Sequence, residues 1–210
     1  MSKPSRALIV VDVQNDYVSG NLPIEYPKVQ NSLTNIGKLM DAAHAAALPV
    51  VVVQNLLASD APFMAEGTSG AALHELVDSR PHDHYISKKL PSAFSGTGLE
   101  DWLRQRSIDT IAVAGYMTHN CILSTMLHGF HSGFTVEFVS DASGSVPYEN
   151  RAGHASAEEV HRVISVILQS RFAAVMSTDE WIAMLRAGTI PERDSIFLSN
   201  HRARGLALPS

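Results

Sequence analysis

The sequence predicts an α/β fold: a single domain with an open, mostly parallel six-stranded sheet and helices on both of its faces. Short apolar runs alternate with longer amphipathic segments along most of the 210 residues. The runs are rich in β-branched residues and almost uninterrupted, as strands covered on both faces are. A chain of this length can bury one good core without cross-links, and it contains no internal repeat.

The first half of the chain supplies three of the expected strands. The run RALIVVDV is continuously apolar between its ends, and the run LPVVVVQN repeats that pattern. Between them, apolar residues recur every three to four positions, which predicts an amphipathic helix. The expected elements are strands at 6–13, 48–55 and, with a weaker signal, 83–87, and helices at 29–43 and 71–78.

The second half continues the alternation with three more strands. Gly133 is a favoured stop residue after one helix, and Thr178 is a good N-cap for the last one. Since parallel strands need helical crossovers, the whole pattern predicts a Rossmann-like three-layer sandwich. The expected elements are strands at 110–115, 134–140 and 173–176, and helices at 99–103, 119–132, 151–172 and 178–185.

The chain divides into a domain over residues 1–187 and a C-terminal tail over residues 188–210. The tail contains Pro191, Pro209 and the basic patch His201–Arg204, and its sequence predicts an irregular segment. Tails of this kind pack on a neighbouring subunit or stay mobile. Packing of the tail on a neighbouring subunit and a mobile tail are therefore both open interpretations.

Composition excludes several classes of function. The chain carries 16 Lys and Arg against 21 Asp and Glu, a formal charge of −5, which gives no electrostatic footprint for nucleic acid or an anionic membrane. Its apolar runs are too short to span a bilayer. The first strand begins so early that we expect no signal peptide and a cytoplasmic protein. The single cysteine, Cys121, excludes an intramolecular disulfide and a four-thiolate zinc site.

Polar residues stand where the predicted strands end, and ligands bind at the carboxyl ends of strands in such sheets. Asp12, Gln54, Lys88 and the turn from Gly115 to Cys121 occupy these positions. We therefore expect a binding or catalytic site along this edge.

Cys121 is the candidate nucleophile, because it lies at the predicted start of a helix. The helix dipole and free N–H groups there favour a thiolate and can also stabilise an oxyanion. On position alone, a buried structural cysteine is an equally good interpretation.

Asp12 and Lys88 are the candidate charged partners. A carboxylate at the end of a buried strand has a raised pKa and suits a general base, although a lone Asp in a turn usually caps a loop. An ammonium near Asp12 and Cys121 would balance their charges, although Lys88 and Lys89 taken alone are typical solvated lysines.

Three motifs together resemble the isochorismatase-like cysteine hydrolase superfamily: VDVQNDY around Asp12, KKLPSAF beginning at Lys88, and GYMTHNCI ending beside Cys121. The resemblance extends from Ala7 to about Trp181, and includes the DASGS segment at 141–145 and the helix that contains His161. It implies a catalytic triad of Asp12, Lys88 and Cys121. Lys88 is chosen over Lys89 because it stands four residues before Ser92.

The resemblance also implies an oxyanion hole and a reaction. A cis peptide between Tyr116 and Met117 would aim the N–H groups of Met117 and Cys121 at the oxyanion. The implied enzyme is a cysteine hydrolase that cleaves an amide, imide or ureido C–N bond of a small molecule through a thioester, without a cofactor. It also implies a homo-oligomer.

The sequence lacks the Asp-x-His pair that nicotinamidase-like members carry after the second strand, so we expect no metal site. His82, Asp83 and His84 form the local His and Asp cluster, but it precedes the third strand, and a polar loop is the better interpretation. Isochorismatases proper hydrolyse a vinyl ether and lack the cysteine, so the presence of Cys121 argues against that reaction.

Neighbours of the motifs are candidates for the substrate pocket. Aromatic walls would suit a planar amide, although aromatic residues near a core strand more often serve packing. Gln54 could hydrogen-bond a substrate or simply be solvated. The candidates are Tyr17, Gln54, Phe63, Phe94, Tyr116 and His119.

Two other functions stay open at this point. Cys121 could be an oxidisable sensor in a redox or regulatory protein, since an accessible thiol of low pKa serves both roles. The chain could also be a catalytically silent oligomeric scaffold, since a fold does not determine a function.

Overall fold

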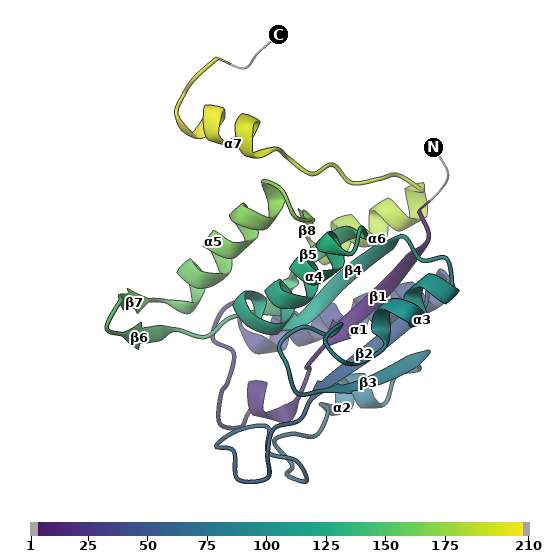
Figure 1. Ribbon diagram of the computed structural model, residues 1–210, viewed down its shortest axis with the longest axis vertical. Coiled ribbons are helices and arrows are strands. Elements are labelled where there is room, and N and C mark those ends of the chain that lie inside the picture. The colour runs from purple at the N-terminus through teal and green to yellow at the C-terminus, as the bar shows by residue number, and fades with distance from the viewer. Residues whose placement is uncertain (1–3, 208–210) are drawn as a thin grey trace.

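The computed structural model describes residues 4–207, and six strands form one sheet in the order β3-β2-β1-β4-β5-β8 (Figure 1). Every pairing in this sheet is parallel. The predicted six-stranded parallel α/β sheet is therefore confirmed. Its strands are β1 (Arg6–Val11), β2 (Val50–Asn55), β3 (His84–Lys88), β4 (Thr110–Tyr116), β5 (Thr135–Gly144) and β8 (Ala174–Met176).

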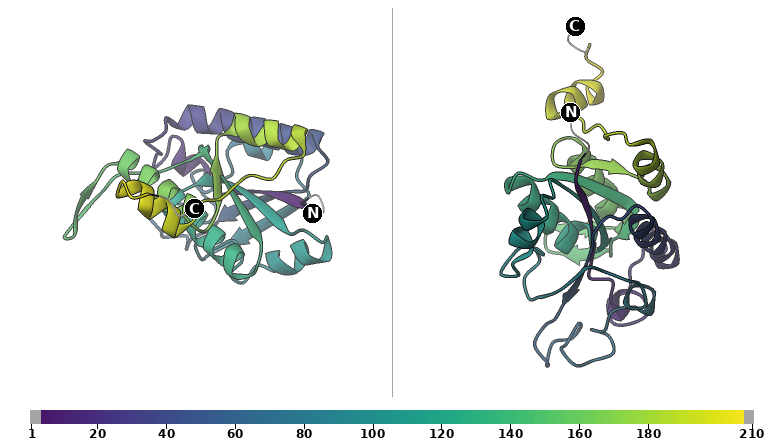
Figure 2. Two further views of the ribbon diagram at one scale, coloured as in Figure 1. Left: turned by 90° about the horizontal axis from the view of Figure 1, so that it is seen from above. Right: turned by 90° about the vertical axis from the view of Figure 1, so that its right-hand side faces the viewer.

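Helices cover both faces of the sheet, because alternate strand residues point to opposite sides and both sides are apolar. Along β1, Leu8 and Val10 face one core, while Ala7, Ile9 and Val11 face the other. Figure 2 shows the resulting layers. The first core lies under α1 (Val29–Ala45), α2 (Glu75–Asp78) and α6 (Thr178–Ala187), and the second under α3 (Leu99–Gln105), α4 (Leu123–His131) and α5 (Ala157–Gln169).

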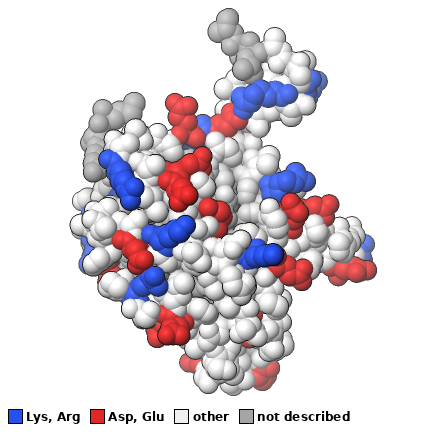
Figure 3. All heavy atoms as spheres, turned by 180° about the vertical axis from the view of Figure 1, so that it is seen from behind, with Lys and Arg blue, Asp and Glu red and all other residues white. Residues whose placement is uncertain are grey.

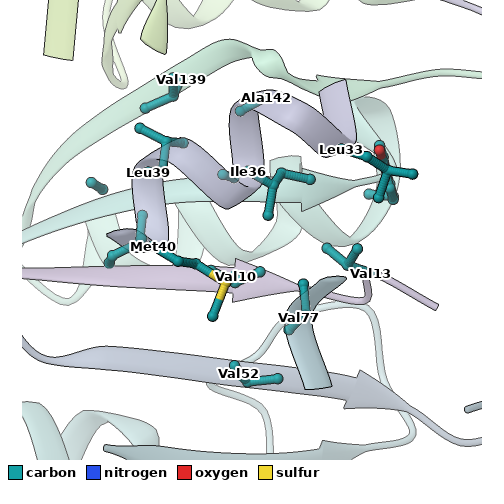
Figure 4. Packing of buried hydrophobic residues seen from close by; sticks show 14 of the residues in the cluster. Val10, Val13, Leu33, Ile36, Leu39, Met40, Val52, Val77, Val139 and Ala142 are labelled. Atoms are coloured by element: carbon teal, nitrogen blue, oxygen red, sulfur yellow. The ribbon is translucent and has the colours of Figure 1, made fainter. Parts of the chain in front are cut away.

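The first core shows how the helical spacing becomes packing. Leu33, Ile36, Leu39 and Met40 all come from one side of α1 and are buried against the sheet (Figure 4). Their neighbours come from β1, β2, β5 and α2, so α1 ties four elements together. This rigid layer holds the carboxyl ends of the strands in fixed relative positions.

Three predicted helices begin later than expected, and the one expected from residue 71 begins at Glu75. The segment from residue 119 first forms a π-helical turn (Thr118–Ile122) before α4. The helix expected from residue 151 begins at Ala157, because Ser156 and Glu159 form a capping box there. The residues before it form a hairpin of β6 (Tyr148–Asn150) and β7 (Gly153–Ala155), which the sequence analysis missed.

The N-cap of α6 is Ser177, so the prediction of Thr178 was wrong by one residue. The Ser177 side chain accepts a hydrogen bond from the N–H of Glu180, and Glu180 completes a capping box. Thr178 instead donates its hydroxyl to Asp141 Oδ1 at 2.7 Å.

The tail is not wholly irregular, because it contains α7 (Ile196–Ala203). Ser195 caps this helix by accepting a hydrogen bond from the N–H of Leu198 at 3.1 Å. None of the residues of α7 is buried, and the helix lies beyond the end of the sheet (Figure 1). Residues 1–3, at the start of the predicted domain, lie outside the described residues. So do residues 208–210, at the end of the predicted tail, which include Pro209.

Surface charge and helix hydropathy agree with the composition. On the face drawn in Figure 3, basic and acidic side chains are interspersed. Within residues 4–207, no helix is both long enough and apolar enough to cross a membrane.

Candidate active site

The carboxyl ends of four neighbouring strands meet at one edge of the sheet. Val11 at the end of β1 is in register with Val53 of β2 on one side and Gly115 of β4 on the other. Asn55 at the end of β2 is in register with Lys88 at the end of β3. This register places Asp12, Asn55, Lys88 and the turn after β4 side by side.

Gly115 allows β1 and β4 to approach closely at this edge. Its φ is 111°, and a Cβ atom there would lie 2.0 Å from the carbonyl oxygen of Val11. Only glycine fits such a conformation and such a contact. The turn that follows Gly115 is thereby held directly beside Asp12.

Asp12 and Lys88 form an ion pair that is completely buried. The distance from Lys88 Nζ to Asp12 Oδ2 is 2.7 Å, and both side chains are 0% exposed. Burial raises the pKa of Asp12, and the charge of Lys88 opposes that rise. Asp12 is therefore poised to accept a proton, as a general base must be.

The Lys88 ammonium has three N–H donors and three neighbouring acceptors. Besides Asp12, it donates to Asn55 Oδ1 at 3.2 Å and to Cys121 Sγ at 3.3 Å. The ammonium therefore lies between a carboxylate and a thiol, where it can stabilise whichever of them is negative.

Cys121 lies in the π-helical turn and is only 4% exposed. Burial and the negative charge of Asp12 raise the pKa of the Cys121 thiol well above its usual range, and Lys88 opposes this. The sequence-based expectation of a favoured thiolate was therefore wrong. The helix-terminus argument could not include the loss of solvation, because the turn packs the thiol into the second core.

The nucleophile turn is anchored by buried hydrogen bonds. The Tyr116–Met117 peptide is cis, and the Met117 carbonyl accepts from the N–H groups of Asn120 and Ile122. The Thr118 hydroxyl lies 2.8 Å from Ser143 Oγ and 2.9 Å from His161 Nδ1. Burial lowers the pKa of His161 to about 4, so this histidine is neutral near neutral pH.

Two of the predicted pocket residues lie near the triad. Tyr17, in a 3₁₀ turn (Asn15–Tyr17), is buried, and burial and the charge of Asp12 raise its pKa well above the usual range. His119 precedes Cys121 by two residues in the same turn. Its ring contacts Ser145 Oγ at 3.1 Å and the Tyr148 hydroxyl at 2.7 Å, and burial lowers its pKa to about 4.

Tyr116 and Phe94 both have packing contacts in the two cores. The Tyr116 hydroxyl lies 2.7 Å from Ser32 Oγ of α1, so the ring extends into the first core. Phe94 stacks on His128 of α4, with the ring centroids 5.0 Å apart. Both rings are buried, so the packing role that aromatic residues near a core strand more often have applies to them, and a role in the substrate pocket stays a prediction.

Gln54 and Phe63 also lie apart from the triad. Gln54 follows Val52 on the α1 side of β2, and its side chain donates to the Ala71 carbonyl at 2.7 Å. Phe63 lines a separate cavity of about 600 Å³, together with Asn15 and Asp16. No hydrogen bond joins Gln54 to Asp12, Lys88 or Cys121, and none of these three lines the cavity beside Phe63, so the roles of Gln54 and Phe63 in a substrate pocket stay predictions.

The cluster at residues 82–84 has structural contacts. Asp83 Oδ2 accepts the Val50 N–H at 2.8 Å, and His84 stacks on Trp102. Across residues 4–207, no group of three His, Cys, Asp or Glu side chains could hold a metal ion. Catalysis without a metal ion stays a prediction.

Sequence reasoning missed Asn55, Gln14 and Tyr148 as site residues. Alternation along the second strand was the available signal for Asn55, since it shares the side of Val53 and Cys121. Gln14 stands in the first motif, but its contacts with the end of β2 come from the tertiary fold. No signal marked Tyr148, because its hairpin was not predicted.

Comparisons with known proteins agree with this geometry. The profile of the Isochorismatase domain matches residues 6–180. A protein from Burkholderia xenovorans LB400 that is assigned to the isochorismatases is 61% identical in sequence to this chain. Its crystal structure matches 97% of this chain and 98% of its own, with a TM-score of 0.96.

Two curated relatives are named for their reactions. Streptothricin hydrolase from Streptomyces noursei is 30% identical over 89% of this chain and 64% of its own length. The ureidoacrylate amidohydrolase RutB from Acinetobacter baylyi is 28% identical over 84% of this chain and 82% of its own. With a family profile that spans most of its length, the chain belongs to the isochorismatase family of hydrolases.

Proposed function

We propose that this protein is a metal-independent cysteine hydrolase that cleaves an amide, imide or ureido C–N bond of a small molecule through a thioester. The observation that carries this proposal is the position of the Lys88 ammonium, 2.7 Å from Asp12 and 3.3 Å from Cys121. A general base, a nucleophile and a compensating cation lie together, as covalent acyl transfer requires.

In the first half of the reaction, Asp12 takes the thiol proton while the Cys121 sulfur attacks the carbonyl carbon. The carbonyl electrons move to oxygen, and the N–H groups of Met117 and Cys121 are the proposed donors to that oxyanion. When the intermediate collapses, the C–N bond breaks and the leaving nitrogen takes the proton from Asp12. The product is an amine or ammonia and a thioester on Cys121.

In the second half, Asp12 removes a proton from water as the water oxygen attacks the thioester carbon. The C–S bond breaks, the acyl group leaves with the water oxygen as an acid, and the sulfur regains the proton from Asp12 to restore the thiol. Lys88 keeps its charge throughout, next to Asp12 when the carboxylate is ionised and next to sulfur when the thiolate forms. No cofactor takes part in either half.

Burial and the charge of Asp12 raise the pKa of the Cys121 thiol, which favours a mechanism in which the proton moves to Asp12 as attack begins. The position of Asp12 beside the same ammonium favours the hydrolase over the alternative of a redox sensor, because a sensor needs no general base.

The choice of C–N bonds is supported by two relatives. A streptothricin hydrolase and a ureidoacrylate amidohydrolase match most of this chain. The site itself supplies one buried ion pair with no net charge, so a small, uncharged amide or ureide would enter it at a lower desolvation cost than an ion.

A panel of small amides, imides and ureides tests the proposal. We expect release of amine or ammonia from at least one of them, and an acyl adduct on Cys121 by intact mass at early times. Cys121→Ala should abolish both signals and leave the melting temperature nearly unchanged. Full activity in Cys121→Ala would exclude the thioester mechanism, and no release by the wild type from any compound would favour a silent scaffold.

A further inference from the structure

Asn55 contacts the catalytic lysine, yet the proposed reaction gives it no task. Its side-chain oxygen accepts a hydrogen bond from Lys88 Nζ at 3.2 Å, and the residue is only 8% exposed. The remaining two ammonium contacts are Asp12 and Cys121. Of the three side chains that contact the Lys88 ammonium, Asn55 is thus the one that neither ionises nor acts as a base or nucleophile.

The orientation of the Asn55 amide is well defined. An ammonium cannot accept hydrogen bonds, so the amide oxygen must face Lys88. The amide nitrogen then points to Met64 Sδ at 3.7 Å, a weak acceptor. The side chain therefore has a partner on each end.

The backbone of Asn55 is clamped by Gln14, which is fully buried. The Asn55 N–H donates to Gln14 Oε1 at 2.9 Å, and the Asn55 carbonyl accepts from Gln14 Nε2 at 2.8 Å. Gln14 Nε2 also donates to the Ala71 carbonyl at 2.7 Å. These bonds tie the end of β2 to the segment after Asp12, and so hold Asn55 at a constant distance from the triad.

We propose that Asn55 is a positioning residue, which holds the Lys88 ammonium between Asp12 and Cys121 without neutralising its charge. The inference rests on the proposed function, because that function gives Lys88 its task. It goes further by explaining why an amide stands at this position. A carboxylate could hold the ammonium as well, but it would compete with Asp12 and the developing thiolate for the same positive charge.

The substitution Asn55→Asp tests the charge argument, because it keeps the size and shape of the side chain, adds a negative charge beside Lys88 and otherwise removes only the weak hydrogen bond to Met64 Sδ. We expect alkylation of Cys121 by iodoacetamide, followed by intact mass, to slow about tenfold at a fixed pH near 8, since one pKa unit is a tenfold change in thiolate. Cys121 is the single cysteine, so every adduct reports on this thiol.

Asn31→Asp is the matched control. Asn31 is exposed on α1, so this variant makes the same chemical change and the same change in net charge away from the site. We expect its alkylation profile across pH to equal that of the wild type.

The substitution Asn55→Ala tests the hydrogen bond itself. Without its third acceptor, the ammonium should spend less time beside sulfur, so alkylation should slow several-fold, less than in Asn55→Asp. On an active substrate, kcat should fall while KM changes little, because Asn55 acts through Lys88 and does not touch the substrate.

Alkylation profiles equal to the wild type in both variants would overturn the inference. So would a lowered melting temperature with an unchanged pH profile, because that is the result of a purely structural role. The profile needs no substrate, so the two proposals fail separately. Slowed alkylation without turnover would reject the proposed function alone, and turnover with normal alkylation in both variants would reject the role of Asn55 alone.

Discussion

At the scale of single residues, the site depends on one ammonium that two potential anions share. Asp12 and Cys121 both contact Lys88, and the negative charge of Asp12 is one cause of the raised pKa of the thiol. At rest the proton stays on sulfur, and the ion pair of Asp12 with Lys88 is preserved. In the proposed mechanism, the protonation of Asp12 and of Cys121 is therefore coupled through a single cation.

This coupling predicts opposite effects of Asp12→Asn on two measurements. Removing the carboxylate charge should lower the apparent pKa of Cys121 and speed its alkylation at neutral pH. The same substitution removes the general base, so hydrolysis should fall by about 10²-fold or more. Alkylation rates across pH and steady-state turnover check the two effects. Turnover equal to the wild type would remove Asp12 from the mechanism.

Gly115 gives a second prediction at this scale. Gly115→Ala would bring a Cβ atom within 2.0 Å of the Val11 carbonyl oxygen at a φ of 111°, so the free energy of unfolding should fall by about 3 kcal/mol or more. Urea unfolding measures the change. Gly67→Ala is the control, because its φ is 84° but nothing lies within 4 Å, and it should cost about 1 kcal/mol. Equal losses of unfolding free energy in the two variants would mean that β1 and β4 can move apart to accommodate the added Cβ atom.

At the scale of elements, α5 anchors the nucleophile turn through a neutral histidine. His161 contacts the Thr118 hydroxyl at 2.9 Å, and both side chains are buried. Burial and the nearby His119 lower the pKa of His161 from 6.5 to about 4. Protonation of this residue would put an uncompensated charge between α5 and the turn that carries Cys121.

The lowered pKa predicts how stability depends on pH. The unfolded chain binds a proton at His161 below pH 6.5, whereas the folded chain does so only near pH 4. The stabilisation is therefore fully present above pH 6.5 and is lost as the pH falls toward 4, by up to about 3 kcal/mol.

Melting temperatures between pH 4 and 8 check this dependence. His161→Gln should flatten the curve over this range, although His119, with a pKa also lowered to about 4, keeps part of the slope. His44→Gln, at an exposed position of α1, should leave the slope unchanged. A curve for His161→Gln that is as steep as the wild type would contradict the assignment.

At the scale of the whole molecule, two helices present apolar side chains to solvent. Val166 of α5 is 56% exposed, and Phe197 of α7 is 55% exposed. A helix of eight residues such as α7 is marginal in isolation. These features motivate the prediction that a second copy of the chain covers them. The remaining exposed apolar residues of the two helices are Val163, Ile167 and Ile196.

We therefore expect a homo-oligomer, a dimer or larger, in mass photometry or light scattering. Val166→Glu and Phe197→Glu should each shift the population toward monomer, because a buried unpaired carboxylate is costly. Leu90→Glu, at an exposed position outside α5 and α7, should not. A wild-type protein that is monomeric at micromolar concentration would contradict the prediction.

Chelation supplies another prediction for the whole molecule. Prolonged treatment with EDTA should leave turnover and the melting temperature unchanged, since the positive charge beside sulfur comes from Lys88. Loss of activity that added zinc or iron restores would contradict the metal-independent mechanism.

Local patterns in the sequence were sufficient to predict the parallel sheet, the succession of its six strands along the chain, and the positions of Asp12, Lys88 and the turn with Cys121 at or just after the ends of strands. Periodicity and strand–helix alternation act over a few residues, so they are visible without coordinates. The three motifs pointed to the family for the same reason. The residues at which the helices begin were harder to predict. Capping boxes fix the starts of α5 and α6, but neighbouring residues of similar type are also candidate N-caps.

The tertiary structure decided which side chains share the site and how they are charged. Strand register brings Asn55 to Lys88, whereas alternation turns Gln54 to the opposite face of the sheet. Burial reverses the expected acidity of Cys121, because desolvation depends on every atom packed around the sulfur. Strand register, the face of the sheet to which a side chain points and the desolvation of a buried group all depend on contacts between distant segments. They therefore follow only from the complete fold.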